Sequence, residues 1–149
     1  MTVAVKNVLY TAEVVVEGGR DGHARSSDGR LEVDLDTPSE LEGSGGPGTN
    51  PEQLFGAAYS ACFQSALEGI ARGRNLDVSD CKITARVGVG PVADGGFGLE
   101  VRLELDAPSL SDEDAAAVMT RAHKRCPYSR AIAGNVPVEL AANGTTIAT

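Results

Sequence analysis

The 149-residue chain contains no tryptophan, and aromatic residues make up only 4% of it. Its core must therefore rest on aliphatic side chains, and the hydrophobic share of 42% is ordinary for a globular protein. No apolar run reaches the roughly 18 residues that a membrane-spanning helix needs. The N-terminal segment has no small-residue cleavage site behind a long apolar stretch, so we predict no signal peptide and expect a cytoplasmic protein.

Positive charge is also scarce. Lysine and arginine number 13 against 21 aspartates and glutamates, which gives a net charge of −8 at pH 7. Nucleic-acid backbones and anionic membranes are bound largely through clustered basic side chains. We therefore expect neither nucleic acid nor a membrane among the partners.

Three cysteines and two histidines are the only candidates for thiol or imidazole chemistry. An odd number of cysteines in a chain without a predicted signal peptide does not indicate a disulfide scaffold. Cys62 lies in an apolar helical run, and Cys126 comes 64 positions later, so the two form no local CxxC motif. If the fold brings them together, they are an attacking thiol and its resolving partner. Cys81, which precedes a predicted strand, reads as structural.

Strand patterns fill the N-terminal part of the chain. Segments 8–16, 23–27 and 31–36 are rich in β-branched residues or alternate apolar with polar side chains, which predicts a β-meander. The loop 37–50 follows. A helix then begins sharply, with Asn50 as N-cap and Pro51 as its first residue, and it is apolar on nearly every face, as expected of a buried central helix.

A hairpin and a second helix follow this central helix. Segments 82–90 and 97–105 predict the hairpin, and Ser111 with Asp114 predicts the start of the helix, which should end before Pro127. Short strands are expected near residues 136–140 and 145–148. Strands, helix, hairpin and helix in this order indicate an α+β fold with antiparallel sheets, formed as one domain over residues 1–149.

A buried cysteine is inert unless a fixed cation keeps its thiolate charged, because only the thiolate attacks. Two residues suit this need. Arg20 lies at the tip of a glycine-rich turn, and Glu52, in the first turn of the helix that carries Cys62, could orient its guanidinium. A thiolate with such a pair can attack a peroxide, since the cation stabilises both the sulfur and the departing alkoxide.

Other interpretations remain open from these residues. A cysteine in an apolar helix commonly just fills space, and the macrodipole alone explains Glu52. A zinc site could use His123, Cys126 and Cys62, although no fourth ligand is evident. A thiol-based redox sensor would use the same cysteine pair without catalytic turnover.

Five segments resemble one known family, the organic hydroperoxide resistance proteins within the larger family that includes the osmotically inducible peroxidases. The similarity covers about residues 8–140, and its blocks are GGRDG (18–22), GTNPEQLF (48–55), YSACFQSAL (59–67), GGFGLEV (95–101) and AHKRCPYS (122–129). Two departures are the additional Cys81 and the sequence SRAIAGN after the second cysteine, which places an arginine at Arg130.

The resemblance implies an OsmC-like fold and an intertwined homodimer with its active sites at the subunit interface. It implies that Cys62 is the peroxidatic cysteine, Cys126 the resolving cysteine, Arg20 the active-site arginine and Glu52 the residue that orients it. Fatty-acid and other organic hydroperoxides are the implied substrates, with Phe97 and Tyr128 as candidate contacts. The implied enzyme binds no metal or cofactor and is reduced by dihydrolipoyl groups of a lipoylated protein; a peroxidase of the osmotically inducible branch is the alternative.

Overall fold

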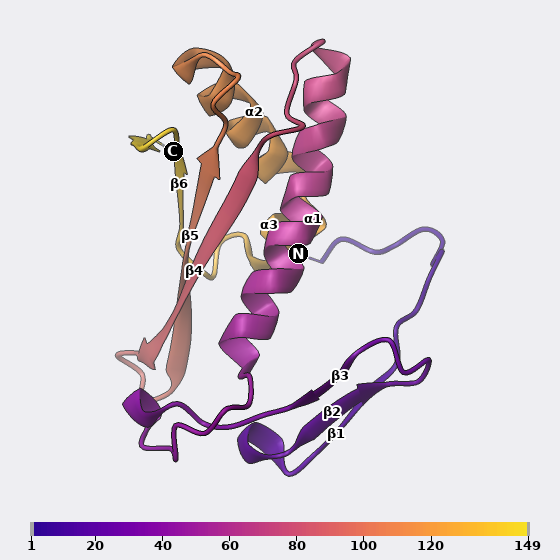
Figure 1. The fold of residues 1–149 in the computed structure, drawn as a ribbon, viewed down its shortest axis with the longest axis vertical. Helices are drawn as coiled ribbons and strands as arrows, with labels where there is room; N and C mark the ends of the chain where they lie inside the picture. Colours follow the sequence, from indigo (N-terminus) through magenta and orange to yellow (C-terminus); the bar gives the residue numbers. More distant parts are fainter. Residues whose placement is uncertain (1, 149) are drawn as a thin grey trace. The chain divides into compact units, whose positions relative to one another are not determined.

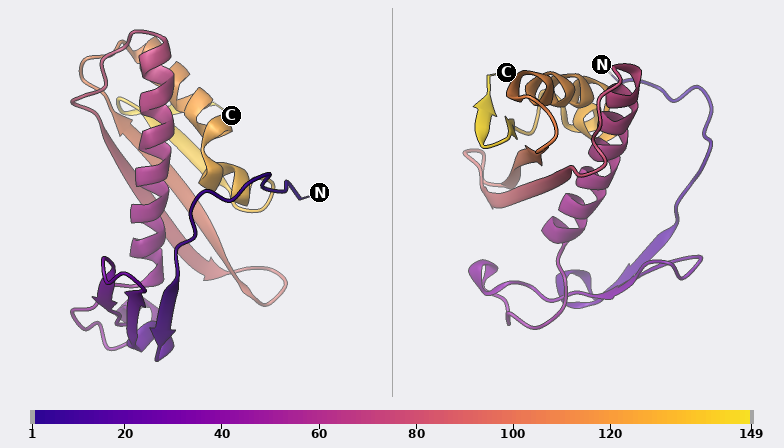
Figure 2. Two further views of the ribbon diagram at one scale, coloured as in Figure 1. Left: turned by 90° about the vertical axis from the view of Figure 1, so that its right-hand side faces the viewer. Right: turned by 45° about the horizontal axis from the view of Figure 1, so that its top comes forward.

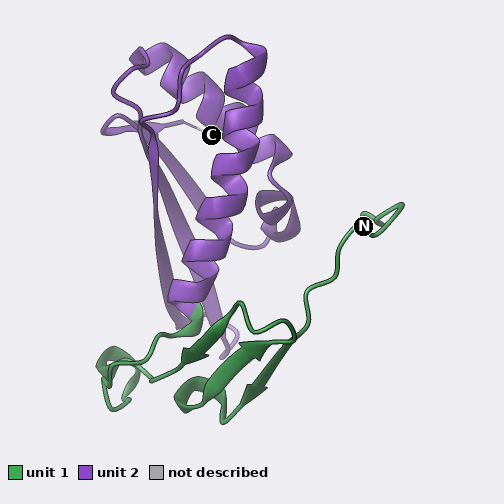
Figure 3. Cartoon of the chain, turned by 45° about the vertical axis from the view of Figure 1, so that its right-hand side comes forward, with its two compact units in different colours: residues 1–51 green, residues 52–149 purple. Residues whose placement is uncertain are grey.

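The computed structural model describes residues 2–148, and the chain divides into two compact units, residues 1–51 and 52–149 (Figure 3). The three-stranded sheet belongs to the first unit, and the four-stranded sheet and all three α-helices belong to the second, apart from Pro51. Mixed α+β architecture was expected from the sequence and is confirmed. None of the helices in the described part of the chain is long and apolar enough to cross a membrane.

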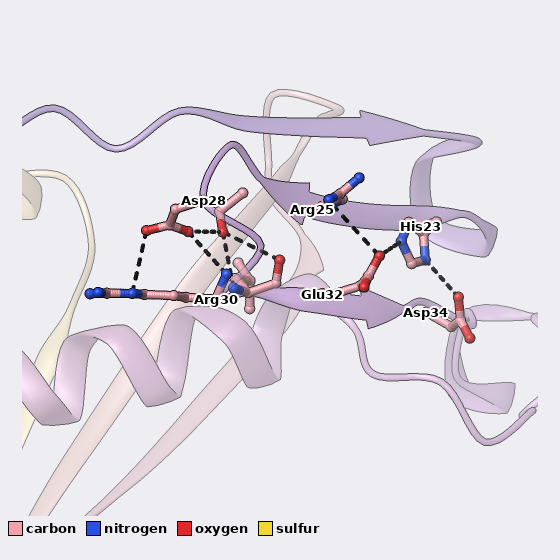
Figure 4. Close-up of polar contacts among 8 residues, drawn as sticks. His23, Arg25, Asp28, Arg30, Glu32 and Asp34 are labelled. Carbon is pink, nitrogen blue, oxygen red and sulfur yellow. Dashed lines mark hydrogen bonds and ion pairs between the residues drawn. The ribbon is translucent and has the colours of Figure 1, made fainter.

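The first unit is the predicted meander. Its strands are β1 (Val14–Glu17), β2 (His23–Ser26) and β3 (Glu32–Asp34), each antiparallel to the next. Cross-strand polar contacts mark the exposed surface, where His23 lies 2.8 Å from Asp34 and 3.2 Å from Glu32 (Figure 4). Two 3-10 turns complete the unit, η1 (Gly19–Asp21) and η2 (Ser39–Leu41).

The first strand is shorter than the predicted segment 8–16, and residues 8–13 belong to no strand. The β1 ladder runs only from Val14, opposite Ser26, to Glu17, opposite His23. β2 is four residues long, so it offers partners to four residues of β1 and no more. The third predicted strand is likewise trimmed to β3. The expected loop 37–50 contains η2 and, at Thr49, an isolated parallel bridge to Leu35.

The second unit has one long helix, a mixed sheet and two shorter helices. Its elements are α1 (Pro51–Gly73), β4 (Lys82–Pro91), β5 (Phe97–Asp106), α2 (Asp112–Arg125), α3 (Pro127–Ile132), β6 (Val138–Ala142) and β7 (Thr145–Ile147). The sheet order is β4-β5-β6-β7. Two of its three strand pairings, β4 with β5 and β6 with β7, are antiparallel as expected. β5 and β6 are parallel instead, because α2 and α3 lie between them in the chain and carry it back to the same end.

The core of this unit lies between the helices and one face of the sheet. Figures 1 and 2 show α1 and α2 on the same side of the strands. Tyr59, Phe63 and Leu67 of α1 are fully buried and pack with sheet residues such as Leu103 and with Met119 of α2. The prediction that α1 is buried on every face needs correction, since in a single chain it buries one stripe and leaves small residues such as Ala57 and Ala61 exposed.

Candidate active site

Cys62 reaches the site from α1, and Cys126 reaches it from the junction between α2 and α3. Cys62 lies in the middle of α1, one residue before the buried Phe63, and is partly exposed. Cys126 is the residue between α2 and α3, with φ −61° and ψ 125°, and its side chain is fully buried. Pro127 explains this break, because a residue that precedes proline is disfavoured in helical geometry.

The two thiols lie side by side and share a hydrogen bond. Both are free, so no disulfide links them. Burial raises the pKa of the Cys62 thiol, and the neighbouring Cys126 raises it further, whereas the backbone N–H of Tyr128 lowers it. Cys62 is the more accessible sulfur of the pair. Because its pKa is raised, it needs an added positive charge to be a thiolate near neutral pH.

A buried chain of hydrogen bonds lies beside the pair. The Tyr59 hydroxyl and the Ser129 hydroxyl are 2.6 Å apart, and Nδ1 of His123 lies 2.9 Å from the same Ser129 oxygen. Tyr59 interacts electrostatically with both cysteines, and burial raises its pKa. Sequence reasoning missed Tyr59 and Ser129; the available signal was that Tyr59 precedes Cys62 by one helical turn and Ser129 follows Cys126 by three residues.

His123 does not join the cysteines as a metal ligand. Its ring is engaged with Ser129, and burial lowers its pKa. Among residues 2–148, no three histidine, cysteine, aspartate or glutamate side chains are grouped so that they could bind a metal ion. The zinc interpretation of His123, Cys126 and Cys62 therefore loses its geometric basis.

Arg20 and Glu52 lie on different units. Arg20 is in η1, after Gly18 and Gly19, whose φ angles of 79° and 59° require glycine-like freedom. Glu52 is in the first turn of α1, ten residues before Cys62. At a rise of about 1.5 Å per residue, this places Glu52 about 15 Å from Cys62 along the helix axis. The predicted roles of both residues remain predictions.

The two candidate substrate contacts differ in position. The Tyr128 ring lies against Tyr59, with centroids 6.0 Å apart, and is 38% exposed beside the cysteine pair. Phe97 is 72% exposed at the start of β5 and lines a cleft of about 900 Å³ at the turn end of the hairpin. Tyr128 thus fits a contact near the thiols, and the role of Phe97 stays a prediction. Cys81 is buried in the core, and burial raises its pKa, in keeping with a structural residue.

Comparisons with known proteins identify relatives across most of the chain. The profile of the OsmC-like protein family matches residues 42–141. An organic hydroperoxide resistance protein of Xanthomonas axonopodis pv. citri is 44% identical over 136 residues, covering 91% of this chain and 95% of the relative.

Solved structures extend the similarity to the fold. An organic hydroperoxide resistance protein from Legionella pneumophila has a TM-score of 0.86 and 42% identity, covering 91% of this chain and 98% of that one. The OhrB protein of Bacillus subtilis has a TM-score of 0.84 and 43% identity, with coverage of 91% and 99%. The chain therefore belongs to the OsmC-like family, in its organic hydroperoxide resistance branch.

Proposed function

We propose that the protein is a thiol peroxidase that reduces organic hydroperoxides, including those of fatty acids, to alcohols. The observation that carries this proposal is the pairing of a partly exposed Cys62 with a fully buried Cys126 that is distant in sequence. Free cysteines that meet in this way can pass between dithiol and disulfide. The relatives are named for resistance to organic hydroperoxides, which supplies the substrate class.

In the first step, the Cys62 thiolate attacks the terminal oxygen of the hydroperoxide. The O–O bond breaks, a proton joins the alkoxide to give the alcohol, and Cys62 becomes a sulfenic acid. In the second step, Cys126 attacks this sulfur, a disulfide forms and water leaves. A dithiol then reduces the disulfide by exchange, and the family resemblance suggests dihydrolipoyl groups of a lipoylated protein for this role.

The site is proposed to be composite, built from two copies of the chain. Glu52 lies about 15 Å along α1 from Cys62 of the same chain. A guanidinium makes hydrogen bonds of about 3 Å to groups on either side of it. A single guanidinium is therefore too small to contact both the Glu52 carboxylate and the Cys62 sulfur of the same chain. Arg20 and Glu52 of one chain would then serve Cys62 of its partner, in agreement with the interface sites that the resemblance implies.

Exposed apolar surface supports a homodimer. Val8, Leu9 and Tyr10, on the N-terminal side of β1, are 65%, 90% and 78% exposed. In the second unit, small residues on the outer face of α1 are exposed too. Exposed apolar side chains that cluster in this way within a unit are typical of protein interfaces. A second copy that covered the outer face of α1 would lie close to Cys62, which this helix carries.

Intact-mass measurement tests the proposal. Reduced protein treated with one equivalent of cumene hydroperoxide should lose two hydrogen atoms, as expected for one disulfide per chain. The Cys126→Ser variant should instead gain oxygen at Cys62, as sulfenic or over-oxidised acid. Repeated turnover with dihydrolipoamide distinguishes a peroxidase from a sensor that uses the same pair. Wild-type protein whose mass does not change would contradict the proposal.

A further inference from the structure

We infer that Tyr59, Ser129 and His123 are positioning residues that set the rate at which Cys126 resolves the oxidised Cys62; this rests on the proposed peroxidase function. Each of the three stands three residues from one of the cysteines. Tyr59 precedes Cys62 on α1, His123 precedes Cys126 on α2, and Ser129 follows Cys126 on α3. Their hydrogen bonds therefore join the three helices that meet at the thiols.

The central group of this chain is the Ser129 hydroxyl. It is 2% exposed and is shared by the Tyr59 hydroxyl at 2.6 Å and by His123 Nδ1 at 2.9 Å. Tyr59 itself is fully buried, and its ring is fixed edge-on by Phe55 and Phe63. A hydrogen bond between two buried groups on different helices restricts how far those helices can move apart, since an unpaired buried hydroxyl is costly.

Resolution is the step most sensitive to this restraint. Cys126 must approach the sulfenic sulfur so that the S–S bond forms as the S–O bond breaks, and its thiol proton leaves with the hydroxyl group as water. The oxidation carried by the sulfenic sulfur is then shared by both sulfurs, and no further reactant is needed. Such an intramolecular step depends steeply on how the reacting groups are held. Attack on peroxide does not involve Cys126, so the restraint should affect that step less.

The competition between disulfide formation and over-oxidation measures this step directly. A second peroxide converts the waiting sulfenic acid to sulfinic acid, so the peroxide concentration that gives equal amounts of the two products is proportional to the resolving rate. In the Tyr59→Phe variant we expect this concentration to fall about tenfold, which corresponds to about 1.4 kcal/mol in the barrier. Ser129→Ala should have a larger effect, because it also leaves the Tyr59 hydroxyl without its partner.

Non-additivity separates positioning from general destabilisation. Both substitutions remove the same hydrogen bond, so Tyr59→Phe/Ser129→Ala should be no worse than Ser129→Ala alone. Thr120→Val is the matched control, since within residues 2–148 this α2 hydroxyl bonds only the Ala116 carbonyl of its own helix. The product ratio of this variant should equal that of wild type. Thermal melts establish that each variant folds, and if Ser129→Ala does not fold, Tyr59→Phe decides.

Two outcomes overturn the inference in distinguishable ways. If wild type forms the Cys62–Cys126 disulfide and Tyr59→Phe has the same product ratio, the positioning role is wrong while the peroxidase function stands. If wild type forms no such disulfide, the proposed function fails and the inference fails with it.

Discussion

Two inactive variants of this protein should restore each other's activity when they share a dimer. Arg20→Ala removes the cation proposed to activate the partner's thiol, and Cys62→Ser removes the thiol itself. The ground for this expectation is the ten-residue separation of Glu52 from Cys62 on α1, about 15 Å along the axis. Side chains on a helix tilt toward its N-terminus, so the side chain of Glu52 does not close this gap.

Random reassociation of the two variants predicts how much activity should return. Half of the dimers formed from an equal mixture contain one chain of each kind, and each of these has one intact site and one site with both lesions. The mixture should therefore recover about a quarter of wild-type activity per chain, for a dimer with two equivalent sites. The assay unfolds the mixed variants in urea, refolds them together, and follows consumption of cumene hydroperoxide with dihydrolipoamide as reductant.

A second pair of variants controls for any activity that mixing and refolding alone restore. Cys62 and Cys126 share a hydrogen bond within one chain. Mixing Cys62→Ser with Cys126→Ser should accordingly restore nothing, because every site in a mixed dimer then lacks one of its two cysteines. If the Arg20→Ala mixture also stays inactive after verified mixing, the composite site is wrong.

Three further predictions concern thiol reactivity and stability. Arg20→Met should leave the pKa of Cys62 raised, so that alkylation by iodoacetamide at pH 7 slows about tenfold or more, and an unchanged rate would contradict the role of the cation. Phe63→Ala should lower the unfolding free energy in urea by about 3–5 kcal/mol, while the exposed Ser65→Ala should change it by less than about 0.5 kcal/mol. Because burial lowers the pKa of His123, the unfolded state takes up the proton first, and stability should fall as pH drops below 6.5; His123→Gln should flatten this part of the curve.

Local signals in the sequence predicted most of the secondary structure. α1 begins at Pro51, as its N-terminal pattern indicates. The Ser111 hydroxyl accepts a hydrogen bond from the Asp114 N–H at 3.1 Å and starts α2, and Cys126 leaves helical geometry before Pro127. These features depend on residues within one or two turns of each other, so a single sequence is enough to predict them.

Features that depend on distant residues could not be predicted in the same way. The parallel pairing of β5 with β6 follows from how α2 and α3 pack, and the length of β1 follows from the partner that β2 offers. The bond between Tyr59 and Ser129 joins residues 70 positions apart. Neither of these two residues is unusual in its own segment, and their chemical interest appears only when three helices bring them beside the thiols.

The most direct test of the central claim is the turnover of the Cys62→Ser variant. With cumene hydroperoxide and dihydrolipoamide, wild-type protein should consume peroxide through many cycles, and Cys62→Ser should consume none above the rate without protein, because no other thiol can start the reaction. The Cys81→Ser variant should retain wild-type turnover, since Cys81 is a core residue outside the pair. Consumption by Cys62→Ser at the wild-type rate would contradict the assignment of Cys62 as the attacking thiol.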